Sequence, residues 1–388
     1  MPIITSLLDS DLYKITMQQV MFHQFSGACG EYKFLCRNKD MNLLPFKEEI
    51  ENELDSLCNI TYSEEELEYL SKIRFIKPDF IEFLKLFKLN RNHIKVSDID
   101  GVLDIRARGP LYLVSLFEIY VLAIVHEVYS RKVNSDEYTG SMGNARLKEK
   151  IDLLNKYRND NGVIPTIIDF GTRRRFSKDW QRHILKQLID NKLIVGTSNL
   201  MFAKEFNIAP IGTFAHEFLQ MFQGLDVCQL KDSQKYAFQA WCSEYRGDLG
   251  IALSDTLGTI KFLKDFDMYF AKLYDGARHD SGDPFKWGNT LIKHYESMRI
   301  DPKTKTLVFS DSLDINKAID LYEYFKDRIK VSFGIGTNLT NDMGVPALQN
   351  VMKLVSVNNN PVAKLSNNPE KTMCENQNFI NYLREVIS

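Results

Sequence analysis

The sequence lacks the features that would place the protein on nucleic acid or in a membrane. Its 388 residues carry a net charge of −2, whereas proteins that bind nucleic acid or an anionic membrane surface usually carry an excess of positive charge. The N-terminal residues MPIITSLLDSD contain no cationic stretch before an apolar run, so we expect no signal peptide. The longest apolar run, residues 111–125, is interrupted by Glu118 and is shorter than the ~20 residues that span a bilayer. We therefore expect a buried core helix there, a cytoplasmic protein, and neither a nucleic-acid nor a membrane partner.

Cysteines with the spacing of a metal or redox site are also missing. No two of them stand in C-x-x-C spacing, so free thiols in a reducing compartment are the expected state. The six cysteines are Cys29, Cys36, Cys58, Cys228, Cys242 and Cys374.

Three nucleotide and metal motifs fail on inspection. His216-Glu217 begins like the zinc motif H-E-x-x-H, but position 220 is glutamine. Residues 334–339 begin like a dinucleotide fingerprint, but its third glycine is absent. No G-x-x-x-x-G-K-[ST] occurs, so any ATP must be held without a P-loop.

The N-terminal third predicts a mixed α+β region. Residues 12–25 and 78–89 have helical patterns, and Ser63 to Glu66 form a capping box. Residues 93–108 predict two strands joined by a turn at Asp100-Gly101. We interpret the polar residues 140–162 as a linker and residues 351–364 as a hairpin.

The rest of the chain alternates short apolar runs with helical stretches. Such alternation predicts a parallel sheet. Seven runs lie at 165–171, 193–198, 209–213, 251–255, 269–275, 307–311 and 331–334, with helices expected at 177–191, 233–245, 284–299 and 314–328. We predict an α/β protein: an irregular (β/α) barrel of about seven parallel strands over residues 165–364, beside a mixed α+β domain over residues 1–135. Residues 136–164 would connect the two, and residues 365–388 would pack on the first domain. An open doubly wound sheet is the alternative.

Polar residues cluster where the predicted strands end, which is where barrels carry their chemistry. Carboxylates there suit Mg²⁺ and ribose hydroxyls, and arginines suit phosphate oxygens. A glycine-rich turn after the last strand offers backbone N–H groups to a phosphate. The cluster comprises Asp169, Arg173 to Arg175, Ser198, His216, Asp255, Arg278 to Asp280, Asp283, Asp311 and residues 334–337. These residues alone predict a barrel enzyme that acts on a phosphorylated substrate with Mg²⁺.

The motifs together resemble the nicotinate phosphoribosyltransferase family. Each is weak alone, but their order and spacing along the chain are specific. They are DSDLYKITM at 9–17, DFGTRRR at 169–175, GTSN at 196–199, GTFAHE at 212–217, LSDT at 253–256, RHDSGD at 278–283, FSD at 309–311, FGIGTN at 333–338 and KLS at 364–366.

The resemblance implies an ATP-dependent pentosyltransferase of NAD biosynthesis that works as a homodimer with shared active sites. Its substrates would be nicotinate, phosphoribosyl pyrophosphate and ATP, with Mg²⁺ as cofactor. Tyr13 from the partner chain and Phe170 would stack on the pyridine ring, although each equally suits an apolar helix face or core. Arg173 would meet the nicotinate carboxylate, while the roles of Arg174 and Arg175 stay open.

The resemblance also implies a phosphohistidine and a substrate preference. His216 would be phosphorylated by ATP, with its second ring nitrogen held by Glu217 or by a carboxylate from another loop. Ser198 would select nicotinate, because nicotinamide-specific relatives have an acid at that place, and an acid repels a carboxylate. The structural alternative for Ser198 is a helix N-cap.

The remaining site residues would hold the sugar and phosphates. Asp255, Asp280 and Asp311 would bind ribose hydroxyls and magnesium pyrophosphate, with Asp280 and Asp311 as candidate Mg²⁺ ligands. Asp311 also suits a helix cap. Arg278, Gly334, Gly336, Thr337 and Lys364 would bind phosphate.

Other functions compete with this interpretation. A nicotinamide or quinolinate phosphoribosyltransferase would be a relative, but Ser198 and the His216 motif count against both. A barrel enzyme acting on another phosphosugar would need a strand-borne base or Schiff-base lysine, which the strand ends do not clearly offer. A non-catalytic scaffold would be expected to have lost the loop residues.

Overall fold

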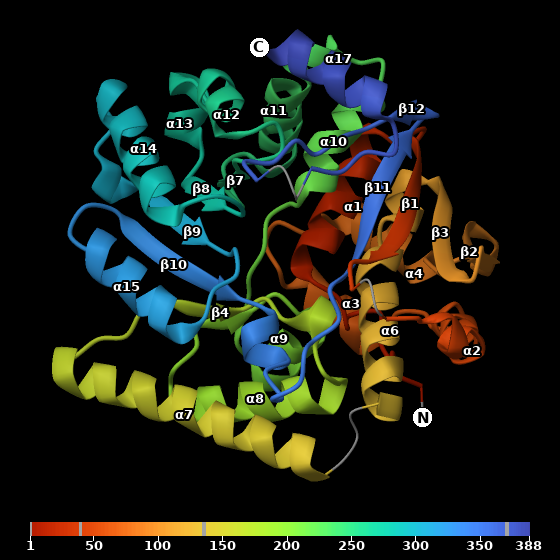
Figure 1. Ribbon diagram of the computed structural model, residues 1–388. Helices are drawn as coiled ribbons and strands as arrows, with labels where there is room; N and C mark the ends of the chain where they lie inside the picture. The colour runs from red at the N-terminus through yellow and green to blue at the C-terminus, as the bar shows by residue number, and fades with distance from the viewer. Residues whose placement is uncertain (1, 39–40, 134–136, 369–371) are drawn as a thin grey trace.

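The computed structural model describes residues 2–38, 41–133, 137–368 and 372–388. Two sheets organise these residues (Figure 1). One is a seven-stranded parallel sheet and the other a five-stranded antiparallel sheet. The predicted α/β class and the division into a barrel-like part and a mixed part are confirmed.

The parallel sheet is an open, curled half-barrel. Its edge strands β6 and β7 are not paired by backbone hydrogen bonds. The Thr213 hydroxyl bridges this opening, donating to the Ile251 carbonyl over 3.0 Å. In sheet order the strands are β6 (Ala209–Pro210), β5 (Gly196–Thr197), β4 (Ile167–Asp169), β10 (Lys330–Ile335), β9 (Thr306–Phe309), β8 (Gly276–His279) and β7 (Ile251–Leu253).

Helices alternate with these strands, as the sequence pattern predicts. Ser177, Asp283 and Asp314 cap three of the predicted helices by accepting backbone N–H hydrogen bonds. The helices are α8 (Lys178–Asp190), α9 (Leu200–Phe206), α10 (His216–Gly224), α11 (Ser233–Tyr245), α12 (Thr259–Asp265), α13 (Met268–Leu273), α14 (Pro284–Ser297), α15 (Ile315–Phe325) and α16 (Thr337–Thr340).

One predicted strand is wrong. Residues 269–275 were expected to be extended, but α13 covers most of them and β8 begins at Gly276. Asp267 starts the helix because its carboxylate accepts from the N–H groups of Tyr269 and Phe270. The strand begins at a glycine because a Cβ there would lie 1.8 Å from the carbonyl oxygen of Thr306.

The antiparallel sheet joins both ends of the chain. Its order is β12 (Asn360–Pro361), β11 (Asn350–Val357), β1 (Cys29–Cys36), β3 (Val102–Pro110) and β2 (Ile94–Ile99). The predicted turn at Asp100-Gly101 is confirmed, with φ of 52° and 80° at these two residues. Strands β11 and β12 belong to this antiparallel sheet and not to the parallel one. The predicted end of the barrel domain at residue 364 is therefore wrong, because the parallel-sheet part ends before β11.

The helices beside this sheet include the apolar run. Helices α5 and α6 together are long and apolar enough to cross a membrane, but most of this stretch is buried inside the protein, as expected for a core helix. The six helices are α1 (Leu12–Gln24), α2 (Lys47–Leu57), α3 (Glu64–Ser71), α4 (Pro78–Leu86), α5 (Leu111–Val114) and α6 (Phe117–Val133). The capping box at Ser63 is confirmed at the start of α3.

Residues 140–162 are a helix and not a linker. They belong to α7 (Glu137–Asn161), which runs along one edge of the molecule (Figure 1). Leu147 and Leu154 are buried along it, and Arg146 and Lys150 both pair with Asp342. A spacing of seven residues between the buried leucines returns to one helix face, a signal hidden by the polar composition.

The C-terminal helix packs on the parallel-sheet half. Helix α17 (Gln377–Ile387) buries Ile380 and Leu383 in a small cluster with Leu257, Ala363 and Leu365. The segment before it touches the antiparallel sheet through Glu375, which pairs with Lys33 over 2.6 Å. The expectation that residues 365–388 pack on the first domain is therefore correct for the contact of Glu375 with Lys33. It is wrong for helix α17, which packs on the parallel-sheet half.

Candidate functional site

The predicted site residues lie at the carboxyl ends of the parallel strands. Phe170 follows β4, Ser198 follows β5, Asp255 follows β7, Asp280 follows β8 and Asp311 follows β9. Parallel strands bring such residues to one edge of the sheet. Helix α10 packs both against α11 and against β11. The site therefore lies between the two sheets.

His216 begins helix α10 and contacts two carboxylates. Its Nε2 lies 2.8 Å from Oδ1 of Asp255 and 3.6 Å from Oδ2 of Asp280. Burial, reinforced by the positive charge of Lys364, lowers the pKa of His216 to about 4. The imidazole is therefore neutral at physiological pH and carries a single N–H. The sequence left two alternatives for the partner of His216, namely Glu217 or a carboxylate from another loop. The structure shows that the partner is Asp255, from another loop.

Lys364 completes this cluster of charges. Its ammonium lies 3.0 Å from Asp255 and 3.6 Å from Asp280. Burial raises the pKa of Asp255, but the contacts with His216 and Lys364 outweigh it and hold the pKa well below its usual range. The Ser281 hydroxyl also donates to Asp255 over 2.7 Å. Asp255 is therefore ionised when it accepts the hydrogen bond from His216.

Two carboxylates of this cluster could share a cation. The ligand atoms of His216, Asp255 and Asp280 lie within 4.8 Å of one another. Carboxylate oxygens are ligands that Mg²⁺ accepts, so Asp255 and Asp280 fit a magnesium ion bound together with phosphate. Asp311, a predicted ligand, lies outside this group of three. It instead interacts electrostatically with His279, which is buried against Trp287 and Phe309.

The N-terminal segment reaches the site of its own chain. The backbone N–H of Leu12 donates to the Ser198 carbonyl over 2.7 Å. A Cβ on Gly212 would lie 3.3 Å from the Tyr13 nitrogen. Tyr13 interacts electrostatically with Arg173 of the same chain, and its buried hydroxyl has no hydrogen-bond partner among the described residues. The segment that carries Tyr13 is therefore anchored beside β5 of its own chain, and the supply of Tyr13 by a partner chain stays a prediction.

Ser198 lies against an acid. Its hydroxyl donates to Oδ1 of Asp11 over 2.7 Å, and both side chains are buried. Burial raises the pKa of Asp11 although the Ser198 hydrogen bond and Arg173 lower it. The neutrality of serine alone therefore does not decide the substrate. A carboxylate placed here meets Asp11 as well, and Arg173 has to offset the repulsion.

The three consecutive arginines have three different surroundings. Arg173 is 42% exposed and its Nη1 lies 3.9 Å from Glu118, so it faces the space between the sheets. Arg174 donates to the Asn350 carbonyl over 3.0 Å. Arg175 is fully buried and pairs with both oxygens of Asp9 at 2.6 and 2.7 Å. Arg173 is therefore placed to meet a substrate, Arg175 anchors the N-terminal segment, and the role of Arg174 stays open.

Phe170 and the glycine turn fit together. A Cβ on Gly334 would lie 2.2 Å from the Phe170 ring, so only glycine leaves room for the ring at that point of β10. The close contact with the Phe170 ring is by itself a sufficient reason for glycine at position 334, whether or not this residue also contacts a phosphate. Gly336 and Thr337 lie beyond the strand, at the start of α16. The predicted 5′-phosphate contact of Gly336 and Thr337 stays a prediction.

A buried charge cluster supports the site from behind. Lys14 of α1 is fully buried and pairs with Glu118 over 2.6 Å and with Glu217. Lys14 thereby ties α1, the helix that carries Tyr13, to the helix that begins at His216. Burial alone would raise the pKa of Glu118, but the positive charges of Lys14, Lys353 and Arg173 outweigh burial and lower the pKa to about 2. Glu217 is thus committed to Lys14 and is not the partner of His216.

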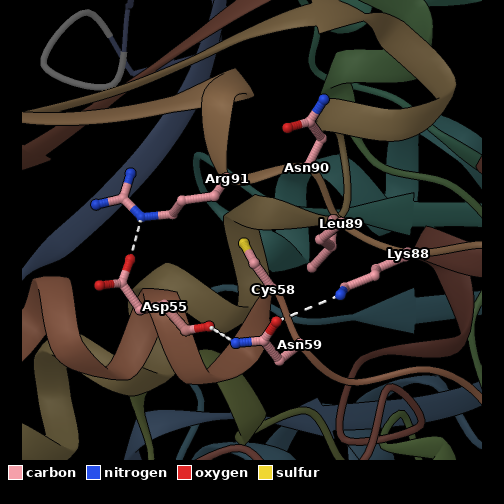
Figure 2. A pocket seen from close by; sticks show the side chains of 7 residues that line it. All are labelled: Asp55, Cys58, Asn59, Lys88, Leu89, Asn90 and Arg91. Carbon is pink, nitrogen blue, oxygen red and sulfur yellow. Dashed lines mark hydrogen bonds and ion pairs between the residues drawn. The ribbon is translucent and has the colours of Figure 1, made fainter.

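A surface hollow lies apart from these residues (Figure 2). It is formed by the end of α2 and the segment before β2. Its charges are already engaged, since Arg91 pairs with Asp55 and Lys88 with Asn59. None of the predicted site residues lines it.

Comparison with known proteins identifies the family of this chain. The profile of the Nicotinate phosphoribosyltransferase (NAPRTase) family matches residues 166–388, and that of the NAPRTase N-terminal domain matches residues 8–126. The chain belongs to the nicotinate phosphoribosyltransferase family. Relatives of that name from Acinetobacter baumannii and Chromobacterium violaceum are each 52% identical and cover 99% of this chain and 97% of their own.

Solved structures with this family name share the fold. The nicotinate phosphoribosyltransferase from Vibrio cholerae has a TM-score of 0.95 and 37% identity, covering 99% of this chain and 94% of its own. The one from Porphyromonas gingivalis has a TM-score of 0.92 and 33% identity, covering 99% and 100%. Both the fold and the family membership inferred from the motifs are therefore confirmed.

Sequence reasoning within this family missed several members of the site. Glu118 was visible as a lone acid inside an apolar run, and Lys353 as a lone cation inside an apolar strand. Asp9, Asp11 and Lys14 stood in the first family motif. Their partners are more than 100 residues away along the chain, so no local pattern could reveal the pairing.

Proposed function

We propose that this chain converts nicotinate and phosphoribosyl pyrophosphate into nicotinate mononucleotide and pyrophosphate, in NAD salvage. ATP hydrolysis through a phosphohistidine at His216 drives the reaction. The observation that carries this proposal is the pairing of a buried, neutral His216 with Asp255 at the strand ends, in a chain of the nicotinate phosphoribosyltransferase family.

The contact with Asp255 determines which nitrogen of His216 reacts. An ionised carboxylate only accepts hydrogen bonds, so the single N–H of the neutral ring is on Nε2. Nδ1 then carries a free electron pair and attacks the γ-phosphorus of ATP, with ADP as the leaving group. As Nδ1 becomes phosphorylated, Asp255 stabilises the positive ring. Water later removes the phosphoryl group as inorganic phosphate and restores the neutral ring.

The transfer step needs positioning more than a protein nucleophile. The C1′–pyrophosphate bond breaks through an oxocarbenium-like state, and the pyridine nitrogen forms the new bond from the opposite face. Tyr13 and Phe170 offer aromatic faces to the pyridine ring, and Arg173 pairs with the nicotinate carboxylate. Arg278 and Lys364 bind phosphate oxygens.

Magnesium has candidate ligands in this arrangement. Asp255 and Asp280 would hold Mg²⁺ together with the pyrophosphate, and the ion would stabilise the negative charge of the leaving group. In the protein alone Lys364 balances these two carboxylates. The fit rests on oxygen donors that converge from two strand ends.

Product formation tests this function. Purified protein is given Mg²⁺, phosphoribosyl pyrophosphate and ATP with either nicotinate or nicotinamide, and mononucleotide is quantified by chromatography. We expect nicotinate mononucleotide, and a higher yield with ATP than without it. Absence of product from both bases would reject the transferase function.

Nicotinamide remains a second candidate substrate because of Asp11. This acid lies 2.7 Å from the Ser198 hydroxyl, and a carboxylate accepts hydrogen bonds from a carboxamide N–H₂. A preference for nicotinamide in the same assay would assign this role to Asp11 and overturn the role given to Ser198.

A further inference from the structure

Ser281 carries a buried hydroxyl that the proposed chemistry does not use. It follows Asp280 in the loop after β8 and is 1% exposed. Its hydroxyl donates to Oδ2 of Asp255 over 2.7 Å, while Oδ1 of the same carboxylate lies 2.8 Å from Nε2 of His216. One carboxylate therefore joins the Ser281 hydroxyl to the imidazole.

The direction of the Ser281 hydrogen bond is set by its other neighbours. The backbone N–H of Asn367 donates to the Ser281 oxygen over 3.2 Å, and the Ser366 hydroxyl lies 3.0 Å from it. A hydroxyl has one proton and two lone pairs, a backbone N–H can only donate, and an ionised carboxylate can only accept. The proton of Ser281 therefore points at Asp255, and its lone pairs face the segment that carries Asn367.

Asn367 in turn holds the loop of Ser281 in place. Its amide N–H₂ donates to the Ser281 carbonyl over 3.3 Å and to the Thr259 hydroxyl over 2.8 Å. Its amide oxygen accepts from the Thr259 N–H over 2.9 Å. A Cβ on Gly282 would lie 3.4 Å from Cβ of Asn367, so the side chain lies close against the backbone next to Ser281. The loops after β7 and β8 are therefore held together by one side chain.

Lys364 is less suited to hold Asp255 during the reaction. Its ammonium also contacts Oδ2 of Asp255, over 3.0 Å, but lies 3.6 Å from Asp280 as well, and it is proposed to bind phosphate. A bound phosphate competes for the ammonium, because phosphate and carboxylate are both anionic. The Ser281 hydroxyl is neutral and anchored from behind, so it keeps its contact with Asp255 when anionic substrates bind.

We propose that Ser281 is a positioning residue for the phosphorylation of His216. Its hydroxyl fixes the orientation of the Asp255 carboxylate, so that Oδ1 holds the N–H of the imidazole and Nδ1 is aimed at the γ-phosphorus of ATP. The γ-phosphoryl group passes to Nδ1 and ADP leaves, while Ser281 acts only through Asp255. The inference rests on the proposed function, because it concerns the phosphohistidine step of that reaction.

Rapid-quench labelling tests the proposal. The wild type, Ser281→Ala, Ser281→Cys and Ser281→Thr are mixed with γ-labelled ATP and Mg²⁺, and acid-labile label on the chain is followed over time. Alanine removes the hydroxyl, cysteine replaces it with a weak S–H donor, and threonine keeps it. Ser254→Ala is the matched control, because the buried Ser254 hydroxyl donates to the Arg278 carbonyl and not to a carboxylate. Thermal unfolding shows which variants are folded, and KM for nicotinate is measured in each.

We expect the labelling rate to fall about tenfold or more in Ser281→Ala and Ser281→Cys, the effect of losing one hydrogen bond to a charged group. It should recover in Ser281→Thr and match the wild type in Ser254→Ala. KM for nicotinate should stay near the wild-type value, because the loss concerns phosphorylation alone. An unchanged labelling rate in the folded alanine or cysteine variant, or an equal loss in Ser254→Ala, would overturn the positioning role. A wild type that takes up no label at His216 would instead overturn the proposed phosphohistidine function itself.

Discussion

At the scale of the residue, the environment of a side chain determines what the same chemical group can do. Asp255 and Asp11 are both buried acids. Contacts with His216 and Lys364 hold the pKa of Asp255 well below its usual range, whereas burial raises the pKa of Asp11. The first is therefore suited to stabilise a positive imidazole. The second makes the pocket around Ser198 sensitive to added negative charge.

Substitution of Ser198 tests this sensitivity. In Ser198→Asp a second carboxylate replaces the hydroxyl 2.7 Å from Asp11, and two adjacent carboxylates repel a third on the substrate. We expect kcat/KM for nicotinate to fall about tenfold or more, ~1.4 kcal/mol, with the ratio moving toward nicotinamide. Ser198→Ala, which adds no charge, is the control in the same steady-state assay. Equal losses in both variants would show that the hydroxyl, and not charge, matters.

Lys353 of β11 lies 4.0 Å from the same Glu118 oxygen that Arg173 approaches to 3.9 Å, and this position predicts a pH dependence of the binding of anionic substrates. The pKa of Lys353 is lowered to about 8 by burial and by Arg173 and Lys364, so its ammonium loses its charge as pH rises through that value. We expect the KM of one substrate to rise between about pH 7 and 9 in the wild type. Lys353→Arg should show a flat profile, because arginine stays protonated over this range. A rise of the same size in Lys353→Arg would assign the titration to another group.

At the scale of the element, helices α1, α6 and α10 meet in the buried Lys14 cluster. Lys14 joins Glu118 of α6 to Glu217 of α10, and α10 carries His216 as its first residue. The cluster therefore fixes the start of α10 relative to α1, the helix that carries Tyr13. A buried charge left without its partner is strongly destabilising.

Removal of Lys14 should accordingly destabilise the fold. In Lys14→Met two buried glutamates lose their shared cation, and we expect the free energy of unfolding to fall by about 3–5 kcal/mol in urea denaturation. The control is Lys47→Met, whose partly exposed ion pair with Glu51 is worth at most ~1 kcal/mol. Similar losses for the two variants would show that the cluster does not stabilise the protein.

Local patterns predicted most elements because their signals are local. The capping box at Ser63, the Asp100-Gly101 turn and the caps of α8, α14 and α15 depend on neighbours within a few residues. Helix α7 was missed because its buried leucines are sparse among polar residues. The position of β8 was wrong because close approach to Thr306, a residue of another strand, determines where that strand begins.

At the scale of the whole molecule, the site combines one edge of the parallel sheet with strand β11 and the N-terminal segment of the same chain. The family motifs led to His216, Asp255 and Asp280, which the structure brings together. They could not show that the segment of Tyr13 is anchored beside β5, and which subunit's site Tyr13 serves stays a prediction. Dimerisation itself stays a prediction.

An active site shared between two chains predicts that activity requires association. We expect specific activity to fall while protein is diluted through a dimer–monomer transition followed by sedimentation. A loss of activity in step with the dimer would show that a partner chain completes the site. Retention of activity by the monomer would contradict this prediction and would show that Tyr13, anchored beside Gly212, serves the site of its own chain.

The central claim is that His216 carries a phosphoryl group between ATP and water. The direct test is to incubate the protein with γ-labelled ATP and Mg²⁺, and to measure acid-labile, base-stable label on the chain with peptide mapping. We predict label at His216, none in His216→Ala, and faster release of phosphate when nicotinate and phosphoribosyl pyrophosphate are added. Label that persists in His216→Ala, or nicotinate mononucleotide formed with full ATP stimulation by that variant, would contradict the account.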